Sequence, residues 1–298
     1  MRDDSTTVLD EGAPDRIPAN SVGRWRLFDM PVDRVDMDVA IGRVAAMIER
    51  GRRWRAEQEA AVPAHGPSGP MRATQRIVTL NPEMVMAARH DAALRESVRS
   101  AALVTADGVG VIWAARLLGG GPLARVTGVD LVDRLAELSA ERGYRLFLLG
   151  GAEGVAAEAA RRLRGRYPGV VIAGTYVGSP HEGDAEAILT VIRQARPDAL
   201  AVAFGVPAQE RWLAAHAGQL GATVAVGVGG ALDYIAGAVP RAPRWMRRAG
   251  LEWLFRLIRQ PWRWRRMRAL PRFALAVGWV WASERPRPGG KGGVQREQ

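Results

Sequence analysis

The sequence predicts an α/β fold, in which a mainly parallel sheet is covered by helices on both faces. From Arg76 onward, short apolar runs alternate with helix-length amphipathic segments, which is typical of βαβ units with right-handed crossovers. Turn or helix-start residues, mostly glycine, proline, asparagine and aspartate, follow the apolar runs. The chain has 298 residues, enough for one large domain with appendages.

The expected elements follow in chain order. Residues 1–24 are polar and acidic at their start and lack an apolar stretch, so we expect a disordered leader and no secretory signal. A short strand then precedes an amphipathic helix from about Asp36. A stretch rich in proline, glycine and alanine at 56–75 predicts a loop or insertion. The expected strands of the main sheet are RIVTL, ALVTA, YRLFLLG, GVVIAGTY, DALAVAFG and GATVAVGVGG.

Positive charge is concentrated near the C-terminal end of the chain. Eleven arginines and a single acid, Glu252, lie between Arg241 and Arg272, whereas the net charge of the whole chain is +11. We therefore expect a nearly neutral α/β domain at 25–240, a basic and aromatic appendage at 241–283 and a disordered tail at 284–298. The apolar run FALAVGWVWA has ten residues, about half the length that a membrane-spanning helix needs.

Polar residues stand directly or shortly after four of the expected strands. Asn81, Asp107, Gln209 and Asp233 follow apolar runs, and ligands of parallel α/β proteins bind at the carboxyl ends of strands. Each residue also has a purely structural explanation. Asn81, Asp107 and Asp233 suit helix caps, and Gln209 lies in an ordinary helix start after Pro207.

A glycine turn follows the strand YRLFLLG. Gly150, Gly151 and Gly154 precede a helix, and such a turn can present backbone N–H groups to a phosphate. A nicotinamide dinucleotide site would also have an acid about 20 residues further on, at the end of the next strand. That strand ends as VVIAGTY, so the pattern disfavours a dehydrogenase.

The sequence predicts neither a metal site nor a bound cofactor. The motif DMD at 36–38 begins a helix and does not end an apolar strand, so it is interpreted as a helix start. Cysteine is absent, which excludes a thiolate site. The histidines lack the spacing of metal ligands; they are His65, His90, His181 and His216.

Together, the strand-end motifs resemble those of the WecG/TagA/CpsF family of bacterial glycosyltransferases. The resemblance covers about residues 24–270, and its motifs are TLNPEM, ADGVGVIWAARLLG, RVTGVDL, LFLLGGAEGVAAEAARRLR, FGVPAQERW and VGGALDYIAGAVPRAPRWMRRAGLEWLFRLIRQPWRWRR. It implies a Rossmann-like fold. It also implies an inverting, metal-independent transfer of a hexose, N-acetylmannosamine-type or related, from a UDP-sugar to a polyprenyl-diphosphate-linked sugar. This step of surface polysaccharide, exopolysaccharide or teichoic-acid-type glycan synthesis would occur at the inner face of the cytoplasmic membrane.

The resemblance also implies roles for individual residues. It makes Asp107 the general base, places Thr79 and Asn81 beside it, and places Gln209 at the donor sugar or diphosphate. A carboxylate at a strand end suits proton removal from an acceptor hydroxyl, and arginines or backbone amides suit a departing diphosphate. The expected nucleotide and donor residues are Arg125, Thr127, Gly150, Gly151, Gly230 and Asp233.

The basic appendage predicts a contact with a membrane. On a helical wheel one apolar stripe, Leu251, Leu254, Phe255, Ile258 and Trp262, lies beside an arginine stripe, with a kink at Pro261. A basic helix with tryptophans suits an anionic leaflet, although a helix pair docked on the body is also compatible with this pattern. The residues expected at the lipid diphosphate or the membrane are Arg256, Arg259, Arg263 and Arg266.

An alternative function is nucleic-acid binding by the same basic segment. It is disfavoured because the strand-end motifs of the nearly neutral body would then have no role, so we expect no nucleic-acid partner. The identities of the donor and acceptor sugars are not determined by the sequence. A homo-oligomer remains compatible with it.

Overall fold

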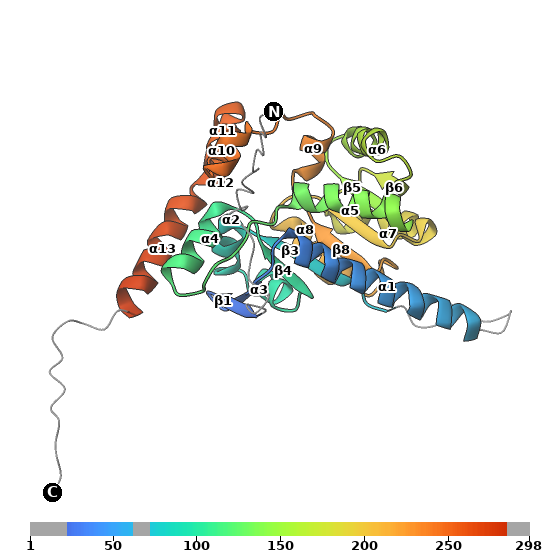
Figure 1. Cartoon of the computed structure of the whole chain (residues 1–298), viewed down its shortest axis with the longest axis horizontal. Coiled ribbons are helices and arrows are strands. Elements are labelled where there is room, and N and C mark those ends of the chain that lie inside the picture. The colour runs from blue at the N-terminus through green and yellow to red at the C-terminus, as the bar shows by residue number, and fades with distance from the viewer. Residues whose placement is uncertain (1–22, 62–71, 285–298) are drawn as a thin grey trace, which may run out of the picture.

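The structure is a computed structural model that describes residues 23–61 and 72–284 (Figure 1). Its centre is a six-stranded sheet of order β4-β3-β8-β7-β5-β6, in which every neighbouring pair is parallel. This confirms the expected α/β class. The strands are β3 Gln75–Leu80, β4 Leu103–Ala106, β5 Arg145–Gly150, β6 Val171–Tyr176, β7 Ala199–Ala203 and β8 Val224–Gly227.

Helices connect the strands of the sheet and continue beyond it. The first nine are α1 Met37–Ala61, α2 Pro82–Ala88, α3 Ala92–Arg99, α4 Val109–Leu117, α5 Gly128–Arg142, α6 Val155–Arg166, α7 Glu182–Ala195, α8 Ala208–His216 and α9 Ala231–Ile235. The C-terminal elements are α10 Arg244–Arg248, α11 Glu252–Arg259, the 3-10 helix η2 Pro261–Arg263, α12 Trp264–Met267 and α13 Ala269–Glu284.

Each face of the sheet has its own apolar core, because successive strand residues point to opposite sides. Ile77 of β3 and Leu148 of β5 belong to the core formed with α1, α5, α6 and α9. Val78 of β3 packs with α2, α3, α4 and α13, and Leu149 of β5 packs with α7 and α8. The strands other than the half-buried edge strand β6 are therefore buried on both sides, as their nearly continuous apolar sequences require.

The N-terminal region differs from the expectation of one short strand. It forms an antiparallel hairpin of β1 Arg24–Leu27 and β2 Met30–Asp33. Phe28 and Asp29 make the turn with positive φ angles of 46° and 65°. The buried Asp33 carboxylate accepts hydrogen bonds from Arg24 Nε at 2.9 Å and from the Val104 backbone N–H at 2.8 Å, which attaches the hairpin to β4.

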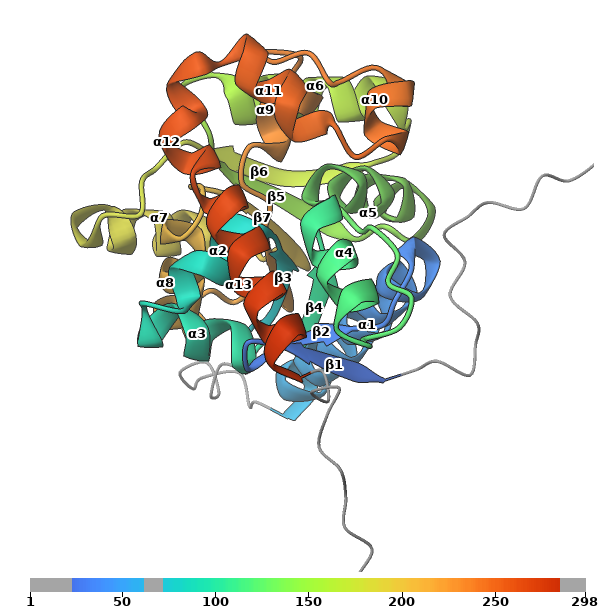
Figure 2. The same cartoon turned by 90° about the vertical axis from the view of Figure 1, so that its left-hand side faces the viewer.

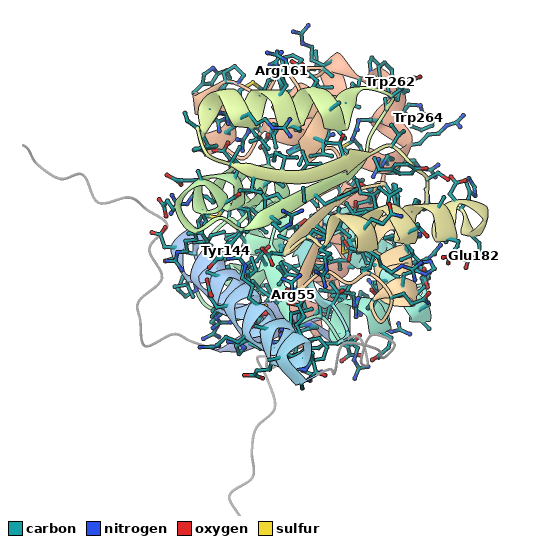
Figure 3. All side chains as sticks on the ribbon, turned by 90° about the vertical axis from the view of Figure 1, so that its right-hand side faces the viewer. Arg55, Tyr144, Arg161, Glu182, Trp262 and Trp264 are labelled. Carbon is teal, nitrogen blue, oxygen red and sulfur yellow. The ribbon has the colours of Figure 1, made fainter. Side chains whose placement is uncertain are left out.

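Helix α1 begins as expected and ends later than expected. Asp36 Oδ1 accepts a hydrogen bond from the Val39 N–H at 2.9 Å, so the DMD motif is a helix start. Because α1 continues to Ala61, the expected loop at 56–75 is wrong for residues 56–61. Near its end, Arg55 pairs with the buried Asp198, and Tyr144 donates a hydrogen bond to Glu49 of α1 (Figure 3). Residues 62–71, with most of the leader and all but the first residue of the expected tail, lie outside the described residues.

The C-terminal elements lie against the body of the protein (Figures 1 and 2). Phe273 and Val277 of α13 are buried in the core that includes α2 and α4. Helix α11 ends at Arg259, and the chain bends before Pro261, which confirms the expected kink. Among the helices of the described ranges, none has both the length and the hydropathy to span a bilayer.

Candidate active site

A cavity of about 240 Å³ lies at the carboxyl ends of β3, β4, β7 and β8. Residues 241–283, here called the C-terminal segment, contribute one side of its lining. Side chains that are far apart in sequence meet there because parallel strands end at the same edge of the sheet. Most of the expected site residues line this cavity. They are Thr79, Asn81, Asp107, Arg125, Thr127, Gln209, Gly230, Arg256, Arg263 and Arg266.

Asp107 follows β4 at the wall of the cavity. Its backbone N–H donates to the Leu80 carbonyl at 2.8 Å, and Gly108 turns the chain with a φ of +98°, a conformation that favours glycine. Burial raises the pKa of Asp107 to about 7, although the positive charge of Arg125 opposes the rise. A cavity carboxyl group with a near-neutral pKa is suited to general base catalysis.

The capping explanation holds for Asn81 and fails for Asp107, and the structure adds Thr127 as a helix cap. Asn81 Oδ1 accepts from the Met84 N–H at 2.9 Å and caps α2, while Thr127 Oγ1 accepts from the Asp130 N–H at 3.2 Å and caps α5. The N-cap of α4 is Gly108, which has no side chain to do this. Asp107 thus lines the cavity without serving as the N-cap of α4.

Gln209 joins two loops at the base of the cavity. Its Oε1 accepts hydrogen bonds from the backbone N–H groups of Gly205 at 3.1 Å and Gly229 at 2.9 Å. Its Nε2 donates to Glu210 Oε1 at 3.1 Å. A Cβ atom at Gly227 would lie 2.1 Å from this Glu210 oxygen, so the close packing requires glycine. Through these bonds, Gln209 fixes the loops after β7 and β8 relative to each other.

Thr79 is a further polar residue of the cavity lining, and Glu210 lies behind the lining residue Gln209. The Thr79 hydroxyl donates to the Gly227 carbonyl at 3.1 Å. Glu210 is fully buried, and burial raises its pKa to about 7. In the sequence Glu210 is indistinguishable from an acid of an ordinary helix start, because its burial depends on how α8 packs in the fold.

Three of the four expected arginines reach the cavity from the C-terminal segment. The Arg256 guanidinium lies 4.9 Å from the centre of the Tyr234 ring, and Arg266 makes two hydrogen bonds to Glu83, of 2.6 and 3.1 Å. Burial and the neighbouring Arg256 and Arg266 lower the pKa of Arg263 to about 10, so Arg263 remains charged at neutral pH.

The structure places four expected site residues outside this cavity. Arg259 is exposed and lies over the Phe255 ring at 5.8 Å. Gly150 and Gly151 lie at the end of β5, where the Gly151 N–H donates to the Ala203 carbonyl at 3.3 Å and is already used. Asp233 lies in the first turn of α9, outside the cavity lining.

Two acidic residues of the cavity were not predicted. Glu83 of α2 pairs with Arg266, and Glu252 of α11 pairs with Arg125 at 3.5 Å. Glu252 carried a signal in the sequence, because it is the single acid of a strongly basic segment. Glu83 lies in a first helical turn, where an acid is common. In the sequence that preference alone explains the residue, so nothing indicates its ion pair with Arg266.

Comparison with known proteins identifies this α/β protein as a glycosyltransferase. Residues 25–287 match the family described as "Glycosyl transferase WecG/TagA/CpsF family". The chain therefore belongs to the WecG/TagA/CpsF family, as its strand-end motifs indicated.

Two relatives of the chain are named for the same enzymatic activity. The chain is 35% identical over 201 residues to the N-acetylglucosaminyldiphosphoundecaprenol N-acetyl-beta-D-mannosaminyltransferase of Bacillus subtilis (strain 168), covering 67% of this chain and 78% of the relative. It is 34% identical over 206 residues to the protein of the same name from Staphylococcus aureus (strain MW2), covering 67% of this chain and 78% of that relative.

Proposed function

We propose that this glycosyltransferase moves a hexose, N-acetylmannosamine-type or related, from a UDP-sugar to a polyprenyl-diphosphate-linked sugar and inverts the anomeric centre. The observation that carries the proposal is the cavity itself, in which Asp107 lies among residues of four strand ends and three arginines of the C-terminal segment. The names of the relatives support the acceptor class, since both contain N-acetylglucosaminyldiphosphoundecaprenol.

The reaction is a single displacement. Asp107 takes the proton of the acceptor hydroxyl, and the hydroxyl oxygen forms a bond to the anomeric carbon while the bond from that carbon to UDP breaks. Negative charge then develops on the departing diphosphate. Arg256 and Arg263 are placed to stabilise this charge, because charge-assisted hydrogen bonds in a shielded site favour the transition state. We propose that this transfer needs no metal ion.

The function is tested with purified protein, a panel of UDP-sugars and a short-chain lipid-diphosphate-sugar acceptor. We expect acceptor-dependent UDP release from one donor, a β-linked product by NMR, and an unchanged rate in EDTA. A rate that falls in EDTA would overturn the metal-independent mechanism. The absence of acceptor-dependent UDP release from every donor of a broad panel would overturn the proposed transfer and direct attention to nucleic-acid binding by the basic segment.

Gly230 provides a test of Arg256. A Cβ atom at Gly230 would lie 2.3 Å from Arg256 Nη2, while its backbone φ of −84° accepts alanine. We therefore expect Gly230→Ala to displace the guanidinium and to lower kcat at least about tenfold with little change in the unfolding temperature. Gly183→Ala is the matched control, because no atom lies near its added Cβ. Full activity of Gly230→Ala would argue against a role for Arg256 at this position.

We further propose that residues 241–283 hold the enzyme on the inner face of the cytoplasmic membrane. Their outer surface carries Trp262, Trp264, Leu275 and Trp279 with exposed fractions of 69%, 54%, 75% and 77%, and the first two point outward in Figure 3. Exposed arginines such as Arg259 lie nearby in the chain. Tryptophan and arginine together suit an anionic interface, to which each basic residue adds about 1 kcal/mol.

The membrane contact is tested by co-sedimentation with vesicles. We expect Leu275→Ser combined with Trp279→Ser to weaken binding to anionic vesicles at least about tenfold, because each side chain loses about 1.5 kcal/mol or more of apolar burial. Val177→Ser, a change of an exposed apolar residue in the loop after β6, is the control. Equal binding of all three proteins would contradict the membrane contact of α13.

A further inference from the structure

Glu252 is the only acid between Arg241 and Arg272, and it lines the cavity beside Asp107. It begins α11, and its side chain is 22% exposed. Its carboxylate lies between two arginines, one from the α/β body and one from the start of the C-terminal segment. Oε2 is 3.5 Å from Nη2 of Arg125, and Oε1 is 3.7 Å from Nε of Arg241.

These contacts continue into the body of the protein. Arg241 Nη2 pairs with Asp130 Oδ1 at 2.7 Å, and Asp130 Oδ2 accepts a hydrogen bond from the Thr127 hydroxyl at 2.7 Å. Arg125 Nη1 also donates to the Arg247 carbonyl at 3.4 Å. Arg125 is therefore held from the C-terminal segment by a carboxylate and a carbonyl. Arg125 also acts electrostatically on the Asp107 carboxyl group in the same cavity, so Glu252 and Asp107 are two negative groups that attract one guanidinium.

We propose that Glu252 is a positioning residue of the transfer site, which holds Arg125 away from Asp107 and keeps Asp107 basic when the C-terminal segment is docked. This inference rests on the proposed function, in which Asp107 is the base. The C-terminal segment then has two roles. It supplies arginines to the cavity, and when docked it also adjusts the basicity of Asp107.

The electrostatics of Asp107 support this role. Burial raises its pKa, Arg125 lowers it, Glu252 raises it, the Gly128 backbone N–H lowers it and Asp130 raises it. The other charged groups of the cavity lining are Glu83, Arg256, Arg263 and Arg266. Removing the Glu252 charge lowers the pKa of Asp107 in two ways, because a like charge disappears and Arg125 loses the carboxylate with which it pairs.

Glu252→Gln tests the inference in the full-length enzyme. We expect the acid limb of the kcat/KM profile to move to lower pH by about half a unit or more. We also expect kcat on the high-pH plateau to fall, since a weaker base removes the proton less efficiently. Glu252→Asp retains the charge and is expected to stay close to the wild-type profile. Glu158→Gln, which neutralises a partly exposed glutamate of α6 paired with Arg161 and Arg162, leaves the profile unchanged.

A structural role alone gives a different result. If Glu252 served only to dock the segment, Glu252→Gln would lower the unfolding temperature or raise KM while the acid limb stayed at its wild-type pH. That result would overturn the inference. It would equally be overturned if Glu252→Asp moved the limb as far as Glu252→Gln.

A direct titration separates this inference from the proposed function. The ¹³C carboxyl resonance of Asp107, assigned by its loss in Asp107→Asn, reports the pKa without any turnover. A lower pKa in Glu252→Gln supports the coupling even if no UDP-sugar is a substrate, and an unchanged pKa overturns it. An active Asp107→Asn enzyme would instead overturn the proposed base while the titration still measured the coupling.

Discussion

Asp107→Asn is expected to lower kcat by about 10³-fold while UDP-sugar binding survives. The amide has nearly the same size as the carboxyl group and cannot take the proton of the acceptor hydroxyl, and general base catalysis contributes about 10²- to 10⁴-fold. The measurement is acceptor-dependent UDP release together with calorimetric titration of the donor. An Asp107→Asn enzyme with wild-type kcat would show that another group is the base.

The pH dependence of the wild-type enzyme follows from the same residue. The pKa of Asp107 is raised to about 7, and only the carboxylate can act as base. We therefore expect kcat/KM to rise with pH, to reach half of its plateau near pH 7 and to follow the titration of one group on the acid side. This limb is the one that Asp107→Asn removes.

Stability measurements distinguish a missing base from a misfolded variant. The folded pKa of Asp107 lies above its ordinary value of 3.8, so between about pH 4 and pH 7 the folded state binds more protons than the unfolded state. The stability of the wild type falls as pH rises through this window. Asparagine does not titrate, and Asp107→Asn is therefore expected to unfold at the same or a higher temperature than wild type at pH 8.

The sheet was predictable because its signal is local. Each strand is a short apolar run bounded by turn residues, and each crossover helix has its own amphipathic period. The hairpin was missed because residues other than glycine occupy its turn, where Phe28 and Asp29 have positive φ. The end of α1 was placed too early, although AEQEAA at 56–61 consists of strong helix formers. The prolines and glycines that follow directly indicate a loop, and in the sequence they obscure this helix propensity.

The site was predictable where it depends on strand ends alone. Asp107 and Gln209 each follow a strand, and parallel strands end at one edge. Gly150 and Gly151 also follow a strand, yet β5 is separated from β3 by β7 and β8. The order of strands in a sheet is a tertiary property that a single sequence does not report. The ion pairs of Glu252 were likewise not predictable, because they form only when the C-terminal segment folds back onto the body.

The combined change Arg256→Gln and Arg263→Gln is expected to lower kcat by about 10²- to 10³-fold, because it removes two charges placed to meet the departing diphosphate. Both guanidinium groups line the cavity, where burial, and then the neighbouring Arg256 and Arg266, lower the pKa of Arg263 to about 10 and disfavour its charge. The measurements are kcat with a soluble short-chain acceptor and the unfolding temperature with and without UDP. Arg161→Gln, on the exposed surface of α6 (Figure 3), is the control.

The same variant separates a site built for an anion from a structural ion cluster. If the arginines form a diphosphate-binding site, their mutual repulsion destabilises the protein in the absence of ligand. The double variant then gains about 2 °C in unfolding temperature without UDP and loses the stabilisation that UDP gives to the wild type. If the arginines instead hold the C-terminal segment on the body, the variant loses stability both with and without UDP. Higher intrinsic stability together with lower activity is therefore the combination that only the anion site produces, since the repulsion that destabilises the empty cavity is relieved when the negatively charged leaving group is bound.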